Sequence, residues 1–378
     1  MIFNQKRFMK NRYHFIDNLR WVSVVLVLIY HVFYNYNALG VFGSAGGFFA
    51  DNQWQDTICT ALNPWFMTLM FVVAGASSKY ALSRRTPEEF RKERTRKLLV
   101  PSVVGLFVFG WVLGLVNISA ANGWEAMPEG MPLWVKYLIA CGSGTGHLWF
   151  IQDLFGFSLL LLLMRKLVDD KAVEKWLTEL SDRGLGLLML ALLPALWVVS
   201  QTQIDNPTAA MGLVNLYRPF FYLVGFFAGY YIFSVERVHD FLAKQWGQLV
   251  AIAVVAGVLF CTLFYGEDYT SPEAVQSIWC NLYCWTMTLA MMGVFKRWCN
   301  RTSNFAGYMS RSSFGLYIVH MAVCSWACWL LKDCGLPVWT IYTLALVATL
   351  LGSVVVWEVL RRIPFVRWAV FGIKKNHK

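Results

Sequence analysis

The sequence predicts an all-α fold: a polytopic integral membrane helical bundle of about ten transmembrane helices, with both termini in the cytoplasm. Of the 378 residues, 57% are hydrophobic and only 15% are charged, whereas about a quarter of a soluble domain is charged. Mean hydropathy is +0.49. The apolar residues fall in stretches long enough to cross a bilayer, and the basic residues gather between alternate stretches.

A helix that crosses the hydrocarbon of a bilayer needs about 20 mostly apolar residues. In chain order, such stretches lie at 16–36, 57–80, 98–120, 147–166, 185–201, 217–234, 248–266, 277–295, 313–331 and 337–359. Backbone exposed to lipid must satisfy its own hydrogen bonds, and the alternating pattern of membrane β-strands is absent from the sequence, so all ten are predicted to be helices.

The distribution of Lys and Arg predicts the orientation. With a cytoplasmic N-terminus, 30 of the 33 basic residues fall in cytoplasmic segments, as the positive-inside rule requires. The net charge of +11 therefore reflects membrane orientation, and no nucleic-acid partner is expected. We expect one transmembrane domain over 1–378 in contact with membrane lipids, with a cytoplasmic segment at 1–14 and a basic cytoplasmic tail at 361–378.

The first span carries polar residues, which are costly inside a membrane and are candidates for function. Arg20 lies at its cytoplasmic end, and His31 lies eleven residues further along the same helix face, about 16 Å away. Asn35 follows one turn later, where its amide can orient the imidazole. A cation at the cytoplasmic end and an imidazole deep inside suit a long anionic donor that enters from the cytosol. Neutral imidazole is a general base suited to pH 7.

A dense group of cations lies between the second and third spans and suits phosphate binding. Its members are Arg84, Arg85, Arg91, Lys92, Arg94, Arg96 and Lys97. Structural alternatives remain open at this point. The cation group can contact anionic lipid, Arg20 can serve as an interfacial anchor, and His31 can form an interhelical hydrogen bond.

Two further groups of candidates lie toward the outer side. The Gly-rich segment 142–146 is predicted to be a flexible outward-facing turn that leads His147 and Trp149 to the outer opening. Tyr317 and His320 are three residues apart in the ninth span, where they can bind substrate or simply pack inside the bundle. No P-loop, G-x-G-x-x-G, G-x-S-x-G or H-E-x-x-H motif is present, so neither a metal site nor nucleotide hydrolysis is expected.

Several separated segments together form a pattern. They are 15–20 followed by His31, 71–75, Arg94 and Lys97 ahead of Pro101, 147–150, and 313–320. This pattern resembles the membrane acyltransferase family three, the multi-pass bacterial enzymes that O-acylate extracytoplasmic glycans. The segments 147–150 and 360–364 are similar to the branch that succinylates periplasmic glucans. Ala74, Ala76 and Lys97 depart from the family pattern, in which Ser, an aromatic residue and Arg are usual at these positions.

The resemblance implies a transferase of the bacterial cytoplasmic (inner) membrane with two substrates. The donor is an acyl-CoA, acetyl-CoA or succinyl-CoA, on the cytoplasmic side, and the acceptor is a hydroxyl of an extracytoplasmic glycan or glycolipid. His31 would deprotonate the acceptor or briefly carry the acyl group, with Asn35 orienting it. Arg20, Arg94 and Lys97 would hold the CoA, Asp17 would fix Arg20, and the candidates for substrate binding are His147, Trp149, Tyr317 and His320.

Two other classes of protein fit ten spans. A transporter or flippase of a lipid-linked sugar would line its path with polar residues, although the sequence lacks the paired halves common in transporters. A scaffolding subunit of an envelope synthase would use the polar residues only to join helices. The acyl group, the acceptor and the oligomeric state stay open.

Overall fold

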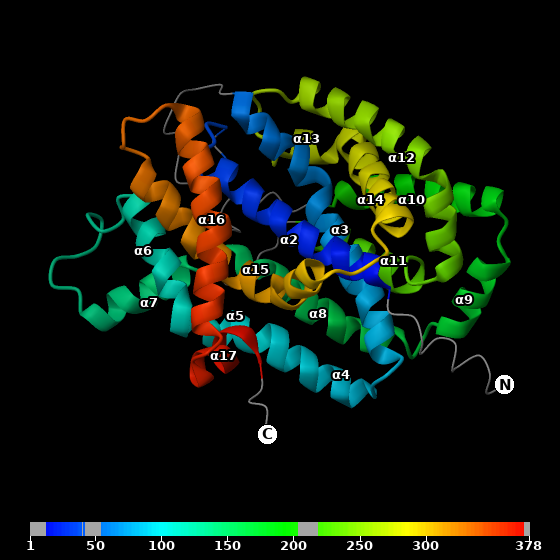
Figure 1. The fold of residues 1–378 in the computed structure, drawn as a ribbon, viewed down its shortest axis with the longest axis horizontal. Coiled ribbons are helices and arrows are strands. Elements are labelled where there is room, and N and C mark those ends of the chain that lie inside the picture. Colours follow the sequence, from blue (N-terminus) through cyan, green and yellow to red (C-terminus); the bar gives the residue numbers. More distant parts are fainter. Residues whose placement is uncertain (1–12, 40, 42–53, 203–217, 374–378) are drawn as a thin grey trace.

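The computed structural model describes residues 13–39, 41, 54–202 and 218–373, and within these ranges every regular element is a helix (Figure 1). The all-α prediction is confirmed. The helices are α2 His14–Asn35, α3 Thr57–Leu82, α4 Pro87–Arg94, α5 Val100–Gly105, α6 Trp111–Ala120, α7 Leu133–Ser143, α8 Trp149–Met164, α9 Asp170–Glu179, α10 Asp182–Ser200, α11 Pro219–Tyr231, α12 Glu236–Leu263, α13 Pro272–Gln276, α14 Ile278–Trp298, α15 Asn304–Leu331, α16 Val338–Leu360 and α17 Pro364–Phe371. Short 3-10 turns are η1 Trp54–Asp56 and η4 Gly146–Leu148, and π-helical turns are η2 Thr95–Leu99 and η3 Leu106–Gly110.

Nine helices in the described ranges are long and apolar enough to cross a bilayer, and they coincide with nine of the ten predicted spans. The prediction of a full span at 217–234 is wrong. There the helix α11 has only 13 residues, about 20 Å, because it begins at Pro219 after a left-handed Arg218 and ends before the turn that leads into α12. It packs closely along α3, where a Cβ on Gly229 would lie 2.1 Å from the carbonyl oxygen of Val72.

The bundle has a buried centre and a lipid-facing periphery. In their most apolar windows, α3 and α14 are 72% and 67% buried, whereas α10, α12 and α16 are each 22% buried. Helix α2 contacts α3, α14, α15 and α16, so its polar residues face other helices rather than lipid (Figure 1). The first predicted span therefore has helical neighbours on several sides that can shelter polar residues from lipid.

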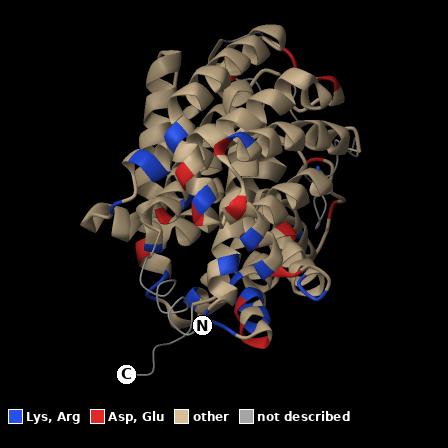
Figure 2. Ribbon diagram, turned by 90° about the vertical axis from the view of Figure 1, so that its right-hand side faces the viewer, with Lys and Arg blue, Asp and Glu red and all other residues tan. Residues whose placement is uncertain are grey.

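One end of the bundle, called the basic end here, collects the start of α2, the end of α3 and the turn from α14 to α15. The amide of Phe15 donates to Oδ1 of Asn300 at 3.2 Å, and Tyr13 stacks on Tyr80 with ring centroids 5.2 Å apart. Figure 2 shows that the uppermost part of the molecule lacks Lys and Arg, which lie in the middle and lower parts of that view.

A polar network ties α9 to the end of α3 near the basic end. The carboxylate of Asp170 accepts a hydrogen bond from Tyr230 at 2.7 Å and pairs with Arg165 at 3.1 Å and Lys79 at 3.3 Å. Burial alone would raise the pKa of Asp170, but the hydrogen bond from Tyr230 and the charge of Lys79 hold it below its ordinary value. The network therefore stabilises the fold through an ionised carboxylate.

Candidate active site

Three histidines from distant parts of the sequence meet inside the bundle. We call His31 of α2, His320 of α15 and His147 of η4 the histidine cluster. The ring of His320 lies between the other two, with centroids 4.9 Å from His31 and 5.0 Å from His147. Nε2 of His320 is 3.2 Å from Nδ1 of His31. The sequence identified all three as candidates, and the fold brings them together.

The hydrogen bonds of His320 and His31 indicate which ring nitrogen of each carries the proton. Nδ1 of His320 lies 2.5 Å from the carbonyl oxygen of Tyr317, so this nitrogen carries a proton and donates. In the neutral ring Nε2 of His320 is then an acceptor, and Nδ1–H of His31 donates to it and to the carbonyl oxygen of Val27 at 2.8 Å. Among the residues that the structure describes, Nε2 of His31 has no hydrogen-bond partner, and the side chain is only partly buried. This nitrogen is free to act as a base.

His147 lies inside the bundle, and the prediction that segment 142–146 is an outward-facing turn leading to the outer opening is wrong. Its Nε2 donates to the carbonyl oxygen of Ile318 at 2.9 Å, midway along α15, and the hydroxyl of Tyr317 donates to the carbonyl of His147. The side chain of His147 is 7% exposed. The connection between α7 and α8 therefore breaks the helical backbone deep in the protein, where irregular backbone is shielded from lipid.

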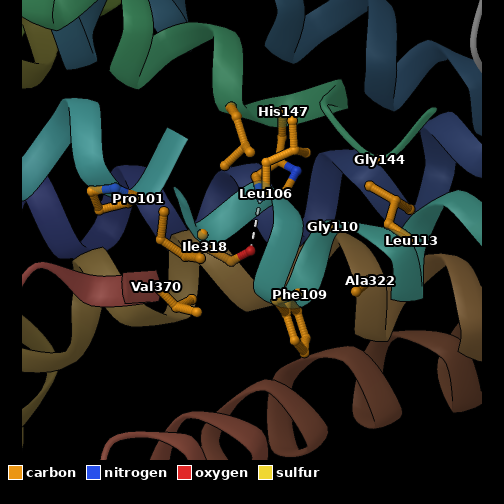
Figure 3. Close-up of a pocket in the computed structure, with 12 residues that line it drawn as sticks. Pro101, Leu106, Phe109, Gly110, Leu113, Gly144, His147, Ile318, Ala322 and Val370 are labelled. Atoms are coloured by element: carbon orange, nitrogen blue, oxygen red, sulfur yellow. Dashed lines mark hydrogen bonds between the residues drawn. The ribbon is translucent and has the colours of Figure 1, made fainter. Parts of the chain in front are cut away.

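Glycine makes this break possible. A Cβ on Gly144 would lie 2.0 Å from the carbonyl oxygen of Gly110, at the end of the π-helical turn η3. The break borders a small cavity of about 20 Å³, enough for one water molecule (Figure 3). Its lining includes His147, Ile318 and the apolar side chains Leu106, Phe109 and Leu113. The cavity is too small for a sugar.

Two other predicted residues lie close to the histidine cluster but make different contacts from those expected. The amide of Asn35 donates to the main-chain carbonyl oxygen of His31 at 2.7 Å and lies 3.5 Å from Sγ of Cys324, so it holds the helix rather than the imidazole. Trp149 is half-buried between Phe71 and Tyr222, with ring centroids 6.1 and 5.4 Å apart. The aromatic contacts of Trp149 fix the start of α8.

At the basic end, Arg20 joins two helices. Its Nη2 donates to Asp17 Oδ1 at 2.8 Å and to Ser310 Oγ of α15 at 3.2 Å, so Asp17 holds the guanidinium, the contact that the resemblance implied. Arg94 donates to Ser78 Oγ at 3.0 Å and lies over the ring of Phe90; its charge interacts with Glu93 and Arg85, and less strongly with Arg20. Arg20 and Arg94 thus form one cationic region.

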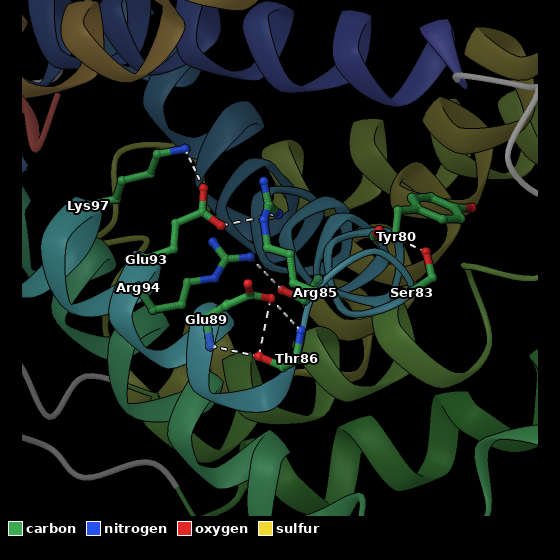
Figure 4. A network of polar contacts seen from close by, with 9 residues as sticks. Tyr80, Ser83, Arg85, Thr86, Glu89, Glu93, Arg94 and Lys97 are labelled. Carbon is green, nitrogen blue, oxygen red and sulfur yellow. Dashed lines mark hydrogen bonds and ion pairs between the residues drawn. The ribbon is translucent and has the colours of Figure 1, made fainter. Parts of the chain in front are cut away.

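Lys97 pairs with Glu93, the carboxylate whose charge also acts on Arg94. Its Nζ lies 2.7 Å from Glu93 Oε1, and the other carboxylate oxygen of Glu93 pairs with Arg85 at 3.1 Å. Figure 4 shows both cations directed to this carboxylate, and Lys97 is exposed. Of the three predicted donor-binding cations, Arg94 interacts with Arg20 and with Glu93, and Lys97 is paired with the same Glu93 at the surface.

Two further features were not predicted as parts of an acyltransferase site. Asp153, one turn after Trp149 in α8, has a buried carboxylate oxygen without a hydrogen-bond partner among the described residues. A polar cleft of about 470 Å³ lies at the basic end between the starts of α2 and α15. In the sequence, Asp153 is a lone acidic residue in an apolar run and was considered only as a lining residue of the alternative transporter path. The cleft could not be predicted, because its residues come from two segments that only the fold brings together. Among the described His, Cys, Asp and Glu residues, no group of three is arranged to hold a metal ion.

The fold and site define a multi-pass membrane protein with a buried imidazole and a cationic region at one end. Comparison with protein families identifies the class more narrowly: the model of the Acyltransferase domain of acyltransferase family 3 matches residues 13–358, nearly the whole chain. The chain belongs to this family and is a membrane acyltransferase. No significant match was found among curated proteins or solved structures.

Proposed function

We propose that this enzyme transfers an acetyl or succinyl group from acyl-CoA at the basic end to a hydroxyl of a glycan or glycolipid on the opposite, extracytoplasmic side of a bacterial inner membrane. The observation that carries the proposal is the hydrogen bonding of His31. Val27 and His320 both engage Nδ1, which leaves Nε2 available to a substrate. The family match favours this reaction over a transporter.

In the proposed reaction, Nε2 of His31 takes the proton from the acceptor hydroxyl as its oxygen attacks the thioester carbonyl carbon. The C–S bond then breaks, and the thiolate of CoA receives the proton from His31. The products are an ester and free CoA. Proton transfer by a positioned side chain contributes about 10² to 10⁴ in rate.

The donor side of the proposal rests on Arg20 and Arg94. The two guanidiniums lie near each other, and Asp17, Ser310 and Ser78 hold them in place. Guanidinium groups bind phosphate through charge-assisted hydrogen bonds. Arg20 lies eleven residues before His31 on α2, about 16 Å along the axis, so a long donor bound there can present its thioester to the imidazole. Lys97 is a secondary donor contact because it is paired with Glu93.

On the acceptor side, His147, Tyr317 and His320 are proposed to shape the inner end of the path that the hydroxyl takes to His31. The hydrogen bonds of His147 with Ile318 and Tyr317 fix η4 against α15, and His320 bonds to Tyr317 within α15. Trp149 acts through packing. Asn35 supports the His31 backbone, which is a positioning role.

The test is acyl transfer by purified protein in detergent, with radiolabelled acetyl-CoA or succinyl-CoA and a panel of glucan, lipopolysaccharide and exopolysaccharide acceptors. The key variant is His31→Asn. Its amide nitrogen takes the place of Nδ1 and keeps a donor toward Val27, but nothing replaces Nε2. We expect folded protein, by thermal unfolding, with kcat lowered by about 10² to 10⁴.

The same variant tests the structural alternative. If His31 only joins helices through Nδ1, His31→Asn retains transfer while His31→Ala loses folding. Transfer at the wild-type rate by His31→Asn would therefore remove the base from the proposal. The absence of transfer and thioester hydrolysis with either donor, in folded wild-type protein, would overturn the donor assignment.

A further inference from the structure

The polar cleft at the basic end is larger than any feature of the histidine cluster. Its volume of about 470 Å³ lies within the range of small-molecule sites, whereas the 20 Å³ cavity beside His147 holds one water. It is lined by His14, Asp17, Asn18, Thr302, Ser303, Asn304, Ala306, Gly307, Ser310 and Arg311. Every residue of this lining belongs to the start of α2, the start of α15 or the turn before α15.

The cleft adjoins the cationic region. Asp17 and Ser310 line the cleft, and both bind the guanidinium of Arg20. Arg311 lines it from α15, and among the described residues it forms no ion pair or hydrogen bond; the same holds for the side chain of Asn304. Because Asp17 is paired with Arg20, the remaining charge of the cleft is positive. Within the part of the chain that the structure describes, the cleft thus offers an unpaired cation and an unpaired amide to an anionic polar ligand.

The distance from the cleft to the histidine cluster sets the length of a ligand that could reach from one to the other. Asn18 and Gly307 line the cleft, and His31 and His320 lie 13 residues further along the same two helices, α2 and α15, which pack against each other. Thirteen residues of helix span about 20 Å. The pantetheine arm and diphosphate of coenzyme A contain about sixteen chain bonds, and at about 3.5 Å for every three extended bonds they reach about 19 Å.

We propose that this cleft holds the phosphorylated nucleotide of the acyl-CoA donor, with the pantetheine arm following α2 and α15 to the histidine cluster. This inference rests on the proposed function. Arg311 contacts a phosphate, Asn304 donates to or accepts from the nucleotide, and Arg20 lies where the diphosphate meets the arm. The cationic region then binds the middle of the donor rather than its far end.

The experiment compares two donors that differ only in the nucleotide: acyl-CoA and the corresponding S-acylpantetheine. Arg311→Gln removes the free charge. Gly307→Leu fills the cleft, and its Cβ meets first the flexible end of Arg311 at 3.4 Å, so the helix can accept it. We expect each variant to lower the ratio of kcat/KM for acyl-CoA to kcat/KM for S-acylpantetheine by about tenfold, equivalent to about 1.4 kcal/mol.

Matched controls exist in the same chain. Gly247→Leu adds the same side chain at a glycine of α12 with open space around it, and Arg183→Gln removes a cation that forms no ion pair among the described residues. Both should leave the donor ratio unchanged. A binding readout free of catalysis uses adenosine 3′,5′-bisphosphate in isothermal titration calorimetry. Its Kd should rise about tenfold in Arg311→Gln and stay the same in Arg183→Gln.

The outcomes separate the two proposals. If wild type uses acyl-CoA and S-acylpantetheine with equal kcat/KM, or if the variants lower both equally, the cleft does not bind the nucleotide and the acyltransferase proposal stands. If folded wild type turns over neither donor and does not bind the bisphosphate, both proposals are overturned. A loss confined to acyl-CoA, with weaker bisphosphate binding, supports the cleft.

Discussion

His320 provides the sharpest test of how the histidine cluster works. If its Nε2 orients His31 by accepting the proton on Nδ1, His320→Leu should weaken that orientation without removing the base. The carbonyl of Val27 still holds Nδ1 at 2.8 Å, while the hydrogen bond that the substitution removes is the longer one, at 3.2 Å. A net hydrogen bond is worth about 0.5–1.5 kcal/mol, so kcat should fall by about 2- to 12-fold.

A conservative variant separates positioning from packing. In His320→Gln, an amide oxygen can accept from His31 Nδ1–H, so kcat should recover to within about twofold of wild type. His320→Leu and His320→Gln fill similar volumes, so a purely structural role predicts the same kcat for both. The assay is acyl transfer at saturating donor, beside thermal unfolding of each variant in the same detergent.

Two results would refute this reasoning. A decrease in kcat in His320→Leu as large as that in His31→Asn would make His320 itself the proton carrier. No recovery in His320→Gln, despite wild-type thermal stability, would mean that the hydrogen bond between the two rings does not orient His31.

Three further predictions concern donor binding, the helix break and acid stability. Arg94→Gln should raise KM for acyl-CoA at least tenfold, because a charge-assisted contact is worth about 1.5–3 kcal/mol, whereas Lys97→Gln should change it less than threefold; equal effects would contradict the arrangement. Gly144→Ala should destabilise the protein by about 2 kcal/mol or more, since its Cβ would meet backbone at 2.0 Å, while Gly142→Ala meets nothing within 4 Å and should be neutral in thermal unfolding. Asp170→Asn should lower the unfolding temperature at pH 7. Because the pKa of Asp170 is lowered in the fold, its contribution is complete above about pH 4 and is lost as pH falls through the folded pKa, so the difference from wild type should shrink by pH 3; a constant difference would exclude an ionised role.

Most spans could be predicted from the sequence because hydropathy and the placement of basic residues are local signals. The failure at 217–234 has a tertiary cause. Its residues are apolar enough for a span, but α11 stops after 13 residues and depends on close packing against α3. Composition does not distinguish a short helix sheltered by a neighbour from one that crosses lipid alone.

The parts of the candidate site that lie on a single helix could be predicted from the sequence. Arg20, Asp17 and His31 follow from helical spacing, and the Asp17 contact agrees with it. The same spacing misassigned Asn35, because a side chain four residues on reaches the carbonyl of residue i more readily than its ring. The pairing of His31 with His320 depends on α2 meeting α15.

The depth of His147 was not predictable for a similar reason. The stretch before it, α7, has 11 residues, too few for a membrane span, so the sequence offers no sign that it enters the bundle. Only the fold shows that the end of α7 lies inside the bundle, where Gly144 closely approaches Gly110. A glycine-rich turn at the surface and a glycine-rich break in the interior look the same in a sequence.

The two short helices bear on how the chain enters the membrane during synthesis. At about 16 and 20 Å, α7 and α11 are too short to cross about 30 Å of hydrocarbon by themselves. Each packs through glycine against a helix made earlier: Gly114 of α6 receives α7, and Gly229 of α11 fits against Val72 of α3. Since the chain emerges N-terminus first, each docking surface exists before the short helix arrives. We therefore expect biogenesis of this enzyme to depend on the order of its segments: moving α6 or α3 to a later position in the chain would leave α7 or α11 without a partner at the moment of insertion.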